Sequence, residues 1–182
     1  KIGIGNKPID GGYMLFSPSE RATFIEMEPT SAPLFRRWYG ATEFLNGIER
    51  WCLWVGQTPP DVLRNMPAVM EMLDKVRRFR LGEIDAKNGR ESKGGESSSA
   101  LAATPSRFHV ENIPNSEYLL IPRHSSERRN IVPFGFMTPD SLSGDAILVA
   151  IGITLFHFGV LLSQMHMAWL RTVCGRIKSD YR

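Results

Sequence analysis

The chain has 182 residues, of which 42% are hydrophobic and 23% are charged, values close to those of soluble globular proteins. This composition excludes a disordered, collagen-like or disulfide-scaffold protein, and the length predicts one domain over residues 1–182. The formal net charge of +3 is too small to identify a nucleic-acid partner by itself.

The first half of the chain predicts short strands between helices that begin at Ser, Thr or Pro. Residues 13–16 form a short strand, and the sequence SPSE at 17–20 is a capping box that starts a helix. Residues 48–55, rich in Trp, Leu and Val, predict another strand. The sequence TPPD at 58–61 has the pattern of a second capping box, and Pro67 kinks or divides the helix that follows.

Residues 85–106 differ in composition from the rest of the chain. Only Leu101 in this stretch is strongly apolar, and Gly and Ser are frequent. Such a segment buries too little surface to offset its ordering entropy. We therefore expect residues 85–106 to form a flexible internal loop within the domain.

The second half predicts short strands and one long helix. Residues 107–112, 118–121, 131–137 and 146–151 have strand character, and a helix runs from 154 or 155 to Cys174, with Gly175 as its C-cap. The whole pattern predicts an α/β (mixed α+β) fold. It is a single domain with a twisted mixed sheet flanked by helices, and with a long C-terminal helix.

The uncharged stretch 146–170 is long enough to span a bilayer. It contains several polar residues, however, and Gly152 interrupts it, so strand plus buried helix is the favoured interpretation and no membrane association is expected. His157, Gln164 and Arg171, spaced by seven, would share one helix stripe. His157 and His166 are nine residues apart, on nearly opposite faces of a helix, and cannot share a metal ion.

The two cysteines, Cys52 and Cys174, lack metal-ligand spacing and indicate free thiols in a reducing compartment. The chain begins at Lys1 without a secretory signal. We therefore expect a cytoplasmic protein, of which residues 1–182 are a fragment, and no metal site.

Three basic groups stand out along the chain. They are the sequence KVRRFR at 75–80, the arginines at 123, 128 and 129, and the C-terminal residues 171–182. Each group alone is explained by a solvated surface, and cations at a helix C-terminus also suit the helix dipole. If the groups converge in space, they form a phosphate-binding surface.

Motifs for catalysis are missing from the sequence. No nucleotide-binding glycine loop, zinc-protease or serine-hydrolase motif is present, and in GIGNKPIDGG (residues 3–12) Pro8 interrupts the position where a phosphate-binding helix would start. A metal-dependent nuclease would need an acid-x-Lys strand after Asp140, whereas Glu91-Ser92-Lys93 lies upstream in the loop. Asp140 is more simply a turn residue, and we assign no catalytic residues.

Several ordered stretches carry a resemblance. They are residues 5–12 (GNKPIDGG), 52–54 (CLW), 76–80 (VRRFR), 121–123 (IPR), 125–129 (SSERR), 133–136 (PFGF), 158–161 (FGVL), 165–169 (MHMAW) and 174–182 (CGRIKSDYR). With these stretches the chain resembles the target recognition domain of MmeI-like bifunctional restriction-modification enzymes. In that class one polypeptide carries nuclease, adenine methyltransferase and DNA-reading parts.

The resemblance implies that this chain binds double-stranded DNA sequence-specifically but neither methylates nor cuts it. The longer polypeptide would be an adenine-specific, S-adenosylmethionine-dependent DNA methyltransferase with endonuclease activity. S-adenosylmethionine and Mg²⁺ would bind there, and this fragment would hold no cofactor. Its methyltransferase domain would be a partner within the same polypeptide.

Reading a duplex needs phosphate contacts for register and base contacts for specificity. The candidate phosphate-binding residues are Arg77, Arg78, Arg123, Arg128, Arg129, Arg176 and Lys178. The candidate base-reading residues are Arg107, His109, Glu111 and Asn112, with Ser141, Ser143 and Asp145 from a second predicted turn. Glu127 either reads a base or, more simply, orients Arg128 or Arg129.

A second interpretation comes from a different class of function. The 157–171 helix, with Trp169 and the Met-rich run before it, would instead anchor a protein-docking or scaffold domain. In the DNA-reading interpretation these residues are core, or they pack against the methyltransferase domain. A stability shift on adding DNA, but not a neutral polymer, would favour DNA reading.

Overall fold

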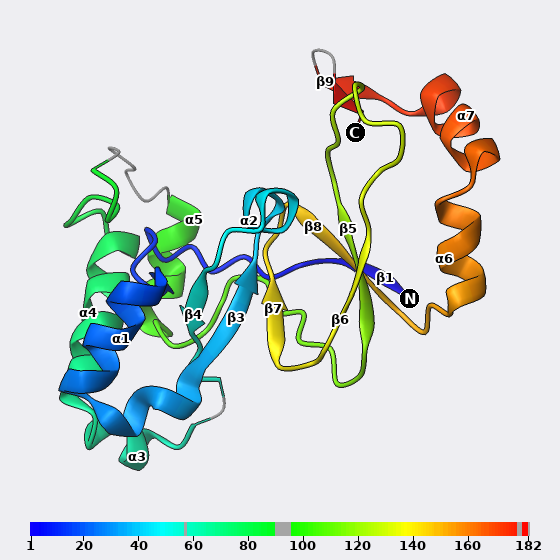
Figure 1. The fold of residues 1–182 in the computed structure, drawn as a ribbon. Coiled ribbons are helices and arrows are strands. Elements are labelled where there is room, and N and C mark those ends of the chain that lie inside the picture. Colours follow the sequence, from blue (N-terminus) through cyan, green and yellow to red (C-terminus); the bar gives the residue numbers. More distant parts are fainter. Residues whose placement is uncertain (57, 90–95, 178–179, 182) are drawn as a thin grey trace. The chain divides into compact units, whose positions relative to one another are not determined.

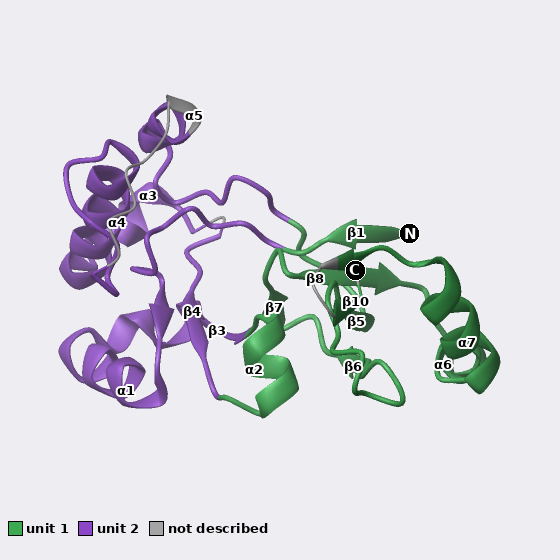
Figure 2. Ribbon diagram, turned by 90° about the horizontal axis from the view of Figure 1, so that it is seen from above, with its two compact units in different colours: residues 1–5, 39–48, 112–182 green, residues 6–38, 49–111 purple. Residues whose placement is uncertain are grey.

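A computed structural model describes residues 1–56, 58–89, 96–177 and 180–181 (Figure 1). The chain divides into two compact units, and each is built from separate segments (Figure 2). Unit 1 comprises residues 1–5, 39–48 and 112–182, and unit 2 comprises residues 6–38 and 49–111. The single domain predicted from the length stays a prediction.

Unit 2 combines a small antiparallel sheet with several helices. Its strands lie in the order β2 (Leu15–Phe16), β4 (Trp51–Leu53) and β3 (Phe35–Tyr39, whose last residue belongs to unit 1). The helices are α1 (Pro18–Met27), η1 (Pro29–Leu34), α3 (Pro60–Arg64), α4 (Pro67–Arg80), α5 (Glu96–Ser99) and η2 (Ala100–Ala103).

The core of unit 2 joins the sheet to α1 and buries one face of α4. The rings of Phe16, Phe24 and Phe35 meet edge to face, with centroids 5.2 to 5.7 Å apart, a preferred aromatic geometry. Val69 and Val76 of α4 are fully buried. This amphipathic spacing leaves the basic end of α4 at the surface, apart from Arg80.

Two predictions about helix starts have opposite outcomes. The capping box at 17–20 is confirmed, because Glu20 N donates to Ser17 Oγ and Ser17 N donates to Glu20 Oε2. The second capping box, at 58–61, is wrong: Pro59 is the N-cap of α3, and proline has no side-chain acceptor. Pro67 occupies the first turn of α4, so it divides two helices as predicted.

The segment 85–106, predicted to be a flexible loop, contains helical turns in part of its length, and its flexibility stays a prediction. Residues 96–103 form α5 and η2, and Ala102 is buried. Residues 90–95, and with them Glu91 and Lys93, lie outside the described residues. The prediction from the low apolar content did not include these turns, because hydrogen bonds from Arg80 of α4 to backbone carbonyls of this segment help to hold them.

Unit 1 is built on an antiparallel sheet in the order β1 (Ile2–Ile4), β8 (Ile147–Ile151), β5 (Tyr118–Pro122) and β6 (Gly135–Met137). In register, Leu119 faces Ala150 and Phe136 across its two neighbouring strands. The unit also contains α2 (Ala41–Asn46), β7 (Ser141–Ser143), α6 (Leu155–Leu161), α7 (Gln164–Val173), β9 (Arg176–Ile177) and β10 (Asp180–Tyr181).

The class of mixed helices and strands is confirmed, but two details are wrong. The strands form separate sheets rather than one, and the pairings described within each unit are antiparallel. The long C-terminal helix is two helices, α6 and α7, which follow one another along unit 1 (Figure 1). Ser163 separates them as the N-cap of α7, its Oγ accepting from His166 N at 3.1 Å, so the predicted stripe through His157 and Gln164 does not form.

Residues 107–112 do not form the predicted strand. Val110 makes an isolated bridge to Lys7 in an otherwise irregular segment. Over the described ranges, none of the helices has the length and apolar character needed to cross a membrane.

Candidate nucleic-acid interface

Two of the three basic groups of the sequence meet within unit 1. Ser125 and Tyr181 form an antiparallel bridge, with N···O distances of 3.2 and 2.9 Å. This bridge brings the segment after β5 beside the β9–β10 hairpin. Arg176 of β9 then pairs with Glu127 at 2.8 Å and stacks over the Tyr181 ring at 4.9 Å, so Glu127 orients Arg176 rather than Arg128 or Arg129.

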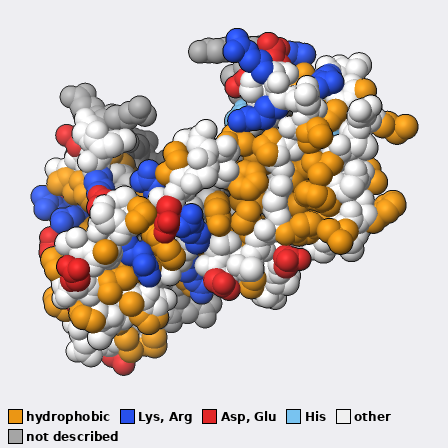
Figure 3. Space-filling model, in the orientation of Figure 1, with side chains coloured by type: hydrophobic (Ala, Val, Ile, Leu, Met, Phe, Trp, Pro, Cys, Tyr) orange, Lys and Arg blue, Asp and Glu red, His pale blue; other side chains and the backbone are white. Residues whose placement is uncertain are grey.

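A second contact joins the same segment to α7, where Arg171 Nη2 donates to Asn130 O at 3.2 Å. Blue side chains gather at this end of unit 1 (Figure 3), where Figure 1 places β9. We name four side chains the arginine cluster: Arg128, Arg129, Arg171 and Arg176. Lys178 lies outside the described residues.

The arginine cluster is basic after its acids are counted. Its four arginines face Glu127 and Asp180 in the same segments, which leaves a formal net charge of +2. Within the described ranges, Arg128 and Arg129 have no ion-pair partner, and Arg128 is exposed. A surplus of unpaired guanidinium groups suits phosphate, whose oxygens accept in the bidentate geometry of arginine.

Arg123 and Asp145 are connected in unit 1. Arg123 Nη1 donates to the backbone O of Asp145 at 3.1 Å, while the Asp145 side chain is exposed in the turn between β7 and β8. Gly5 permits this turn, because a Cβ on Gly5 would lie 2.2 Å from Gly144 O. A phosphate candidate and a base-reading candidate therefore share one turn.

Ser141 and Ser143 lie in a different environment from the one predicted. They form strand β7 rather than a turn, and both are buried. Each hydroxyl lies 3.0 Å from Tyr118 Oη, and burial raises the pKa of that phenol. These serines satisfy a buried tyrosine, so neither presents a hydroxyl to a base edge in this conformation.

In unit 2, three of the candidate base readers, Arg107, His109 and Glu111, lie in an exposed loop. We name residues 107–111 the reading loop. Arg107 Nη1 pairs with Glu111 Oε2 at 3.2 Å, and Glu111 Oε1 accepts from Phe108 N at 3.2 Å. His109 is exposed. Asn112, in unit 1, donates from Nδ2 to Ile4 O at 2.8 Å.

The third basic group, at the end of α4, has two kinds of arginine. Arg77 and Arg78 are half exposed and pair with Asp74 at 3.4 Å and Glu83 at 3.5 Å. Arg80 is fully buried. Its guanidinium donates to five backbone carbonyls at 2.7 to 2.9 Å, those of Pro8, Ile9, Leu101, Thr104 and Arg107.

Sequence reasoning missed the role of Arg80 and of a set of stacked arginines in unit 2. Arg21 lies 4.1 Å from the Trp51 ring centroid and Arg36 lies 4.1 Å from that of Trp54. The signal was the closeness in sequence of arginine and aromatic residues, as in FRRWY (35–39) and RWCLW (50–54), which favours cation–π stacking.

The helices α6 and α7 expose large apolar side chains. Trp169 is 62% exposed and Met165 is 84% exposed, so the core role considered for them does not apply. The other exposed members of this apolar surface are Leu155, Phe156, Val160 and Val173. Whether the surface docks a protein stays a prediction.

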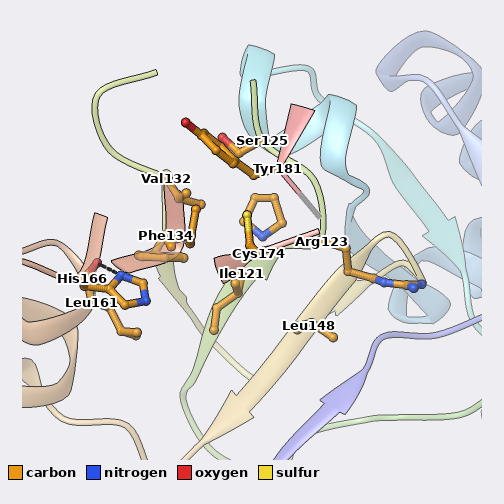
Figure 4. Close-up of a pocket in the computed structure, with 12 residues that line it drawn as sticks. Ile121, Arg123, Ser125, Val132, Phe134, Leu148, Leu161, His166, Cys174 and Tyr181 are labelled. Atoms are coloured by element: carbon orange, nitrogen blue, oxygen red, sulfur yellow. Dashed lines mark hydrogen bonds between the residues drawn. The ribbon is translucent and has the colours of Figure 1, made fainter. Parts of the chain in front are cut away.

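Beside α7, unit 1 has a partly open pocket of about 220 Å³. Figure 4 shows Ser125 and Tyr181 at one end and His166 with Leu161 at another. His166 Nδ1 lies 2.7 Å from Leu161 O, and most other lining side chains are apolar. The pocket thus has few groups that could orient a polar ligand.

The glycine-rich segment 3–12 makes close contacts within the protein. The carbonyls of Pro8 and Ile9 point at Arg80, and Gly11 packs where a Cβ would meet Phe79 at 2.7 Å. Asp140 lies in the turn before β7, as predicted, and its Oδ2 accepts from Thr138 Oγ1 at 3.4 Å. Among the described residues, no three His, Cys, Asp or Glu side chains form a group suited to a metal ion.

Comparison with known proteins agrees with the resemblance in the sequence. The family model described as MmeI, target recognition domain, matches residues 1–182. DNA methyltransferase A of Bacillus subtilis (strain 168) is 32% identical over all of this chain, which spans 20% of that protein. The solved structure of the type IIL restriction-modification enzyme MmeI in complex with DNA matches with a TM-score of 0.89 and 37% identity, over 100% of this chain and 23% of that one. The chain therefore belongs to the MmeI target recognition domain family.

Proposed function

We propose that this chain binds double-stranded DNA and reads its sequence for a larger restriction-modification methyltransferase. The observation that carries the proposal is the arginine cluster, because residues 128–129 and 171–176 are far apart in sequence and meet in unit 1. The solved relative MmeI is a complex with DNA. A fold match over the whole chain supports the same use here.

The proposed contacts divide into two kinds. Phosphates would be bound by Arg123 and the arginine cluster in unit 1, and by Arg77 and Arg78 in unit 2. Bases would be read by Arg107, His109 and Glu111 of the reading loop, by Asn112 and by Asp145. We leave Ser141 and Ser143 out of the proposed set because both are buried.

The pair Arg107–Glu111 suits base reading. The carboxylate holds the guanidinium by an ion pair at 3.2 Å and is itself held by the backbone at Phe108. An oriented guanidinium can donate to guanine O6 and N7 together, which discriminates by about 1–3 kcal/mol.

The test is binding to a pool of randomised duplexes at several salt concentrations. Binding should weaken linearly on a log–log plot as salt rises, because bound phosphates release counterions. The selected duplexes should share a sequence. Binding without a common sequence, or without salt dependence, would refute the proposal.

The chemistry would reside elsewhere in a longer polypeptide. The chain spans about a fifth of the length of its curated relative, which is a DNA methyltransferase. We infer that S-adenosylmethionine, and Mg²⁺ for an endonuclease, would bind to the remainder of a cytoplasmic, adenine-specific enzyme. The residues of this chain would hold the duplex while a base is methylated.

The apolar surface of α6 and α7 favours a second role, docking onto the methyltransferase domain of that polypeptide. Exposed Trp and Met side chains are common anchors in interfaces. The double change Met165→Ser and Trp169→Ser should lower methylation by the longer polypeptide and leave DNA binding by this chain unchanged. Equal methylation by both forms would exclude this role.

A further inference from the structure

We infer that Arg80 is a positioning residue for base reading: its guanidinium fixes the reading loop from beneath without touching DNA. The inference rests on the proposed function, because it takes residues 107–111 as the part of unit 2 that meets base edges. It adds a specificity role for a buried side chain at the end of α4.

The first observation is that Arg80 uses its full donor capacity. An arginine side chain has five N–H donors, and here Nε makes one bond while Nη1 and Nη2 make two each. All five acceptors are backbone carbonyls. The side chains of these five residues can therefore vary without changing the backbone positions that Arg80 holds.

The second observation is that the reading loop is held at two points, one directly by this guanidinium and one through Lys7. The loop starts at Arg107, whose carbonyl accepts from Nη2 at 2.7 Å. Its middle is tied to Lys7, because His109 N donates to Lys7 O at 2.9 Å and Lys7 N donates to Val110 O at 3.0 Å.

The residues after Lys7 complete the connection. Pro8 O and Ile9 O both accept from Arg80, so the segment that supports the loop is held by the same group as the loop itself. Ile9 has φ +48°, a conformation that β-branched residues avoid. The segment keeps this conformation while its carbonyl points at Arg80.

The surroundings of Arg80 are compatible with a guanidinium that stays charged and keeps its hydrogen bonds. Burial lowers the pKa of Arg80, and the nearby charge of Asp10 opposes this effect. Asp10 is itself buried and accepts from Met14 N at 2.8 Å. Arginine remains protonated in such surroundings, so the five bonds persist over the working pH range.

The test compares Arg80→Lys with the unmodified chain on the sequence selected from randomised duplexes. Lysine keeps the charge but has three donors, so at least two of the five carbonyls lose their partner. Discrimination at the base pair that Arg107→Ala relaxes should fall about tenfold. The salt dependence should stay the same, because no phosphate contact changes.

Two matched controls separate positioning from stability. Arg64→Lys makes the same chemical change at an exposed site of α3 and should have no effect. Val69→Ala removes buried volume from α4 without contacting the five carbonyls, so it should destabilise unit 2 but keep discrimination. Loss of discrimination in Val69→Ala, or full discrimination in Arg80→Lys, would overturn the inference and leave the proposed function intact.

Hydrogen exchange on the unmodified chain covers the case in which Arg80→Lys does not fold. The amides of 107–110 should exchange as slowly as those at the end of α4, because one group holds both. Exchange of the loop amides a hundredfold faster would refute positioning. If the unmodified chain selects no sequence, the proposed function fails first and the inference falls with it.

Discussion

Arg128 in the arginine cluster of unit 1 and Arg80 at the end of α4 in unit 2 both stand in basic runs of the sequence, yet they have opposite physical roles. Arg128 is exposed, without an ion-pair partner in the described residues, and its neighbours carry a positive surplus. Arg80 is buried and bonded to five carbonyls. The number of fixed acceptors around a guanidinium decides whether it remains available to an external anion.

The largest expected effect is on stability and belongs to unit 2. Arg80→Ala would remove the side-chain donor of five part-buried carbonyls. Leu101 O and Thr104 O keep a backbone donor, and the other three lose the donor that Arg80 supplies. Breaking a charged network of this kind costs about 3–5 kcal/mol. Arg128→Ala should change the free energy of unfolding by less than about 0.5 kcal/mol, as exposed substitutions do. Urea unfolding of both variants measures the contrast, and equal values would show that Arg80 is not a structural centre.

Part of the secondary structure could be predicted from the sequence. The capping box at Ser17 was predictable because its acceptor and donor are three residues apart. The break at Ser163 was not predictable, because apolar residues continue on both sides of it and hide the N-cap bond that Ser163 accepts from His166 N. Short-range signals therefore predicted the cap of α1 but neither the cap of α3 nor the start of α7 at Ser163.

The candidate site shows the same limit at longer range. Grouping arginines by sequence found Arg128 and Arg176, whose segments then met. It could not separate Arg78 from Arg80, because the acceptors of Arg80 lie 21 to 72 residues away. Ser141 and Ser143 were misplaced for a related reason, since their partner Tyr118 is 23 and 25 residues away.

The next effect is on specificity. Arg107→Ala should lose about 1–3 kcal/mol of discrimination at one base pair, and Asp145→Ala should do so at another, while binding to mismatched duplexes changes little. Competition between selected and singly changed duplexes measures this. Arg64→Ala is the control. A uniform loss over all sequences would instead identify Arg107 as a phosphate contact.

A smaller, sequence-independent effect should come from the arginine cluster. Arg128→Ala removes one cation. The negative slope of the logarithm of the binding constant against the logarithm of salt concentration should become shallower by about 0.9, and the affinity for every duplex should fall by a similar factor. Arg129→Ala should behave alike. An unchanged slope in both variants would move phosphate binding away from this end of unit 1.

The smallest effect tests an exposed ion pair in unit 2 against the buried network of Arg80. Glu20 accepts from Lys87 at 2.8 Å and from Ser17 N at 2.7 Å, and these bonds, Lys87 first, lower the pKa of its carboxyl to about 2 from 4.5. A lowered folded pKa gives stability that is fully present above pH 4.5 and is lost as the pH falls to about 2.

Both side chains remain partly exposed, so water screens the pair and its contribution should stay below about 1 kcal/mol. Glu20→Gln should lower the free energy of unfolding by that amount at pH 7 and flatten its dependence between pH 2 and 4.5. Glu26→Gln, on the same helix, is the matched control. A loss as large as that of Arg80→Ala would mean that exposure does not separate the Glu20–Lys87 ion pair from the buried network of Arg80.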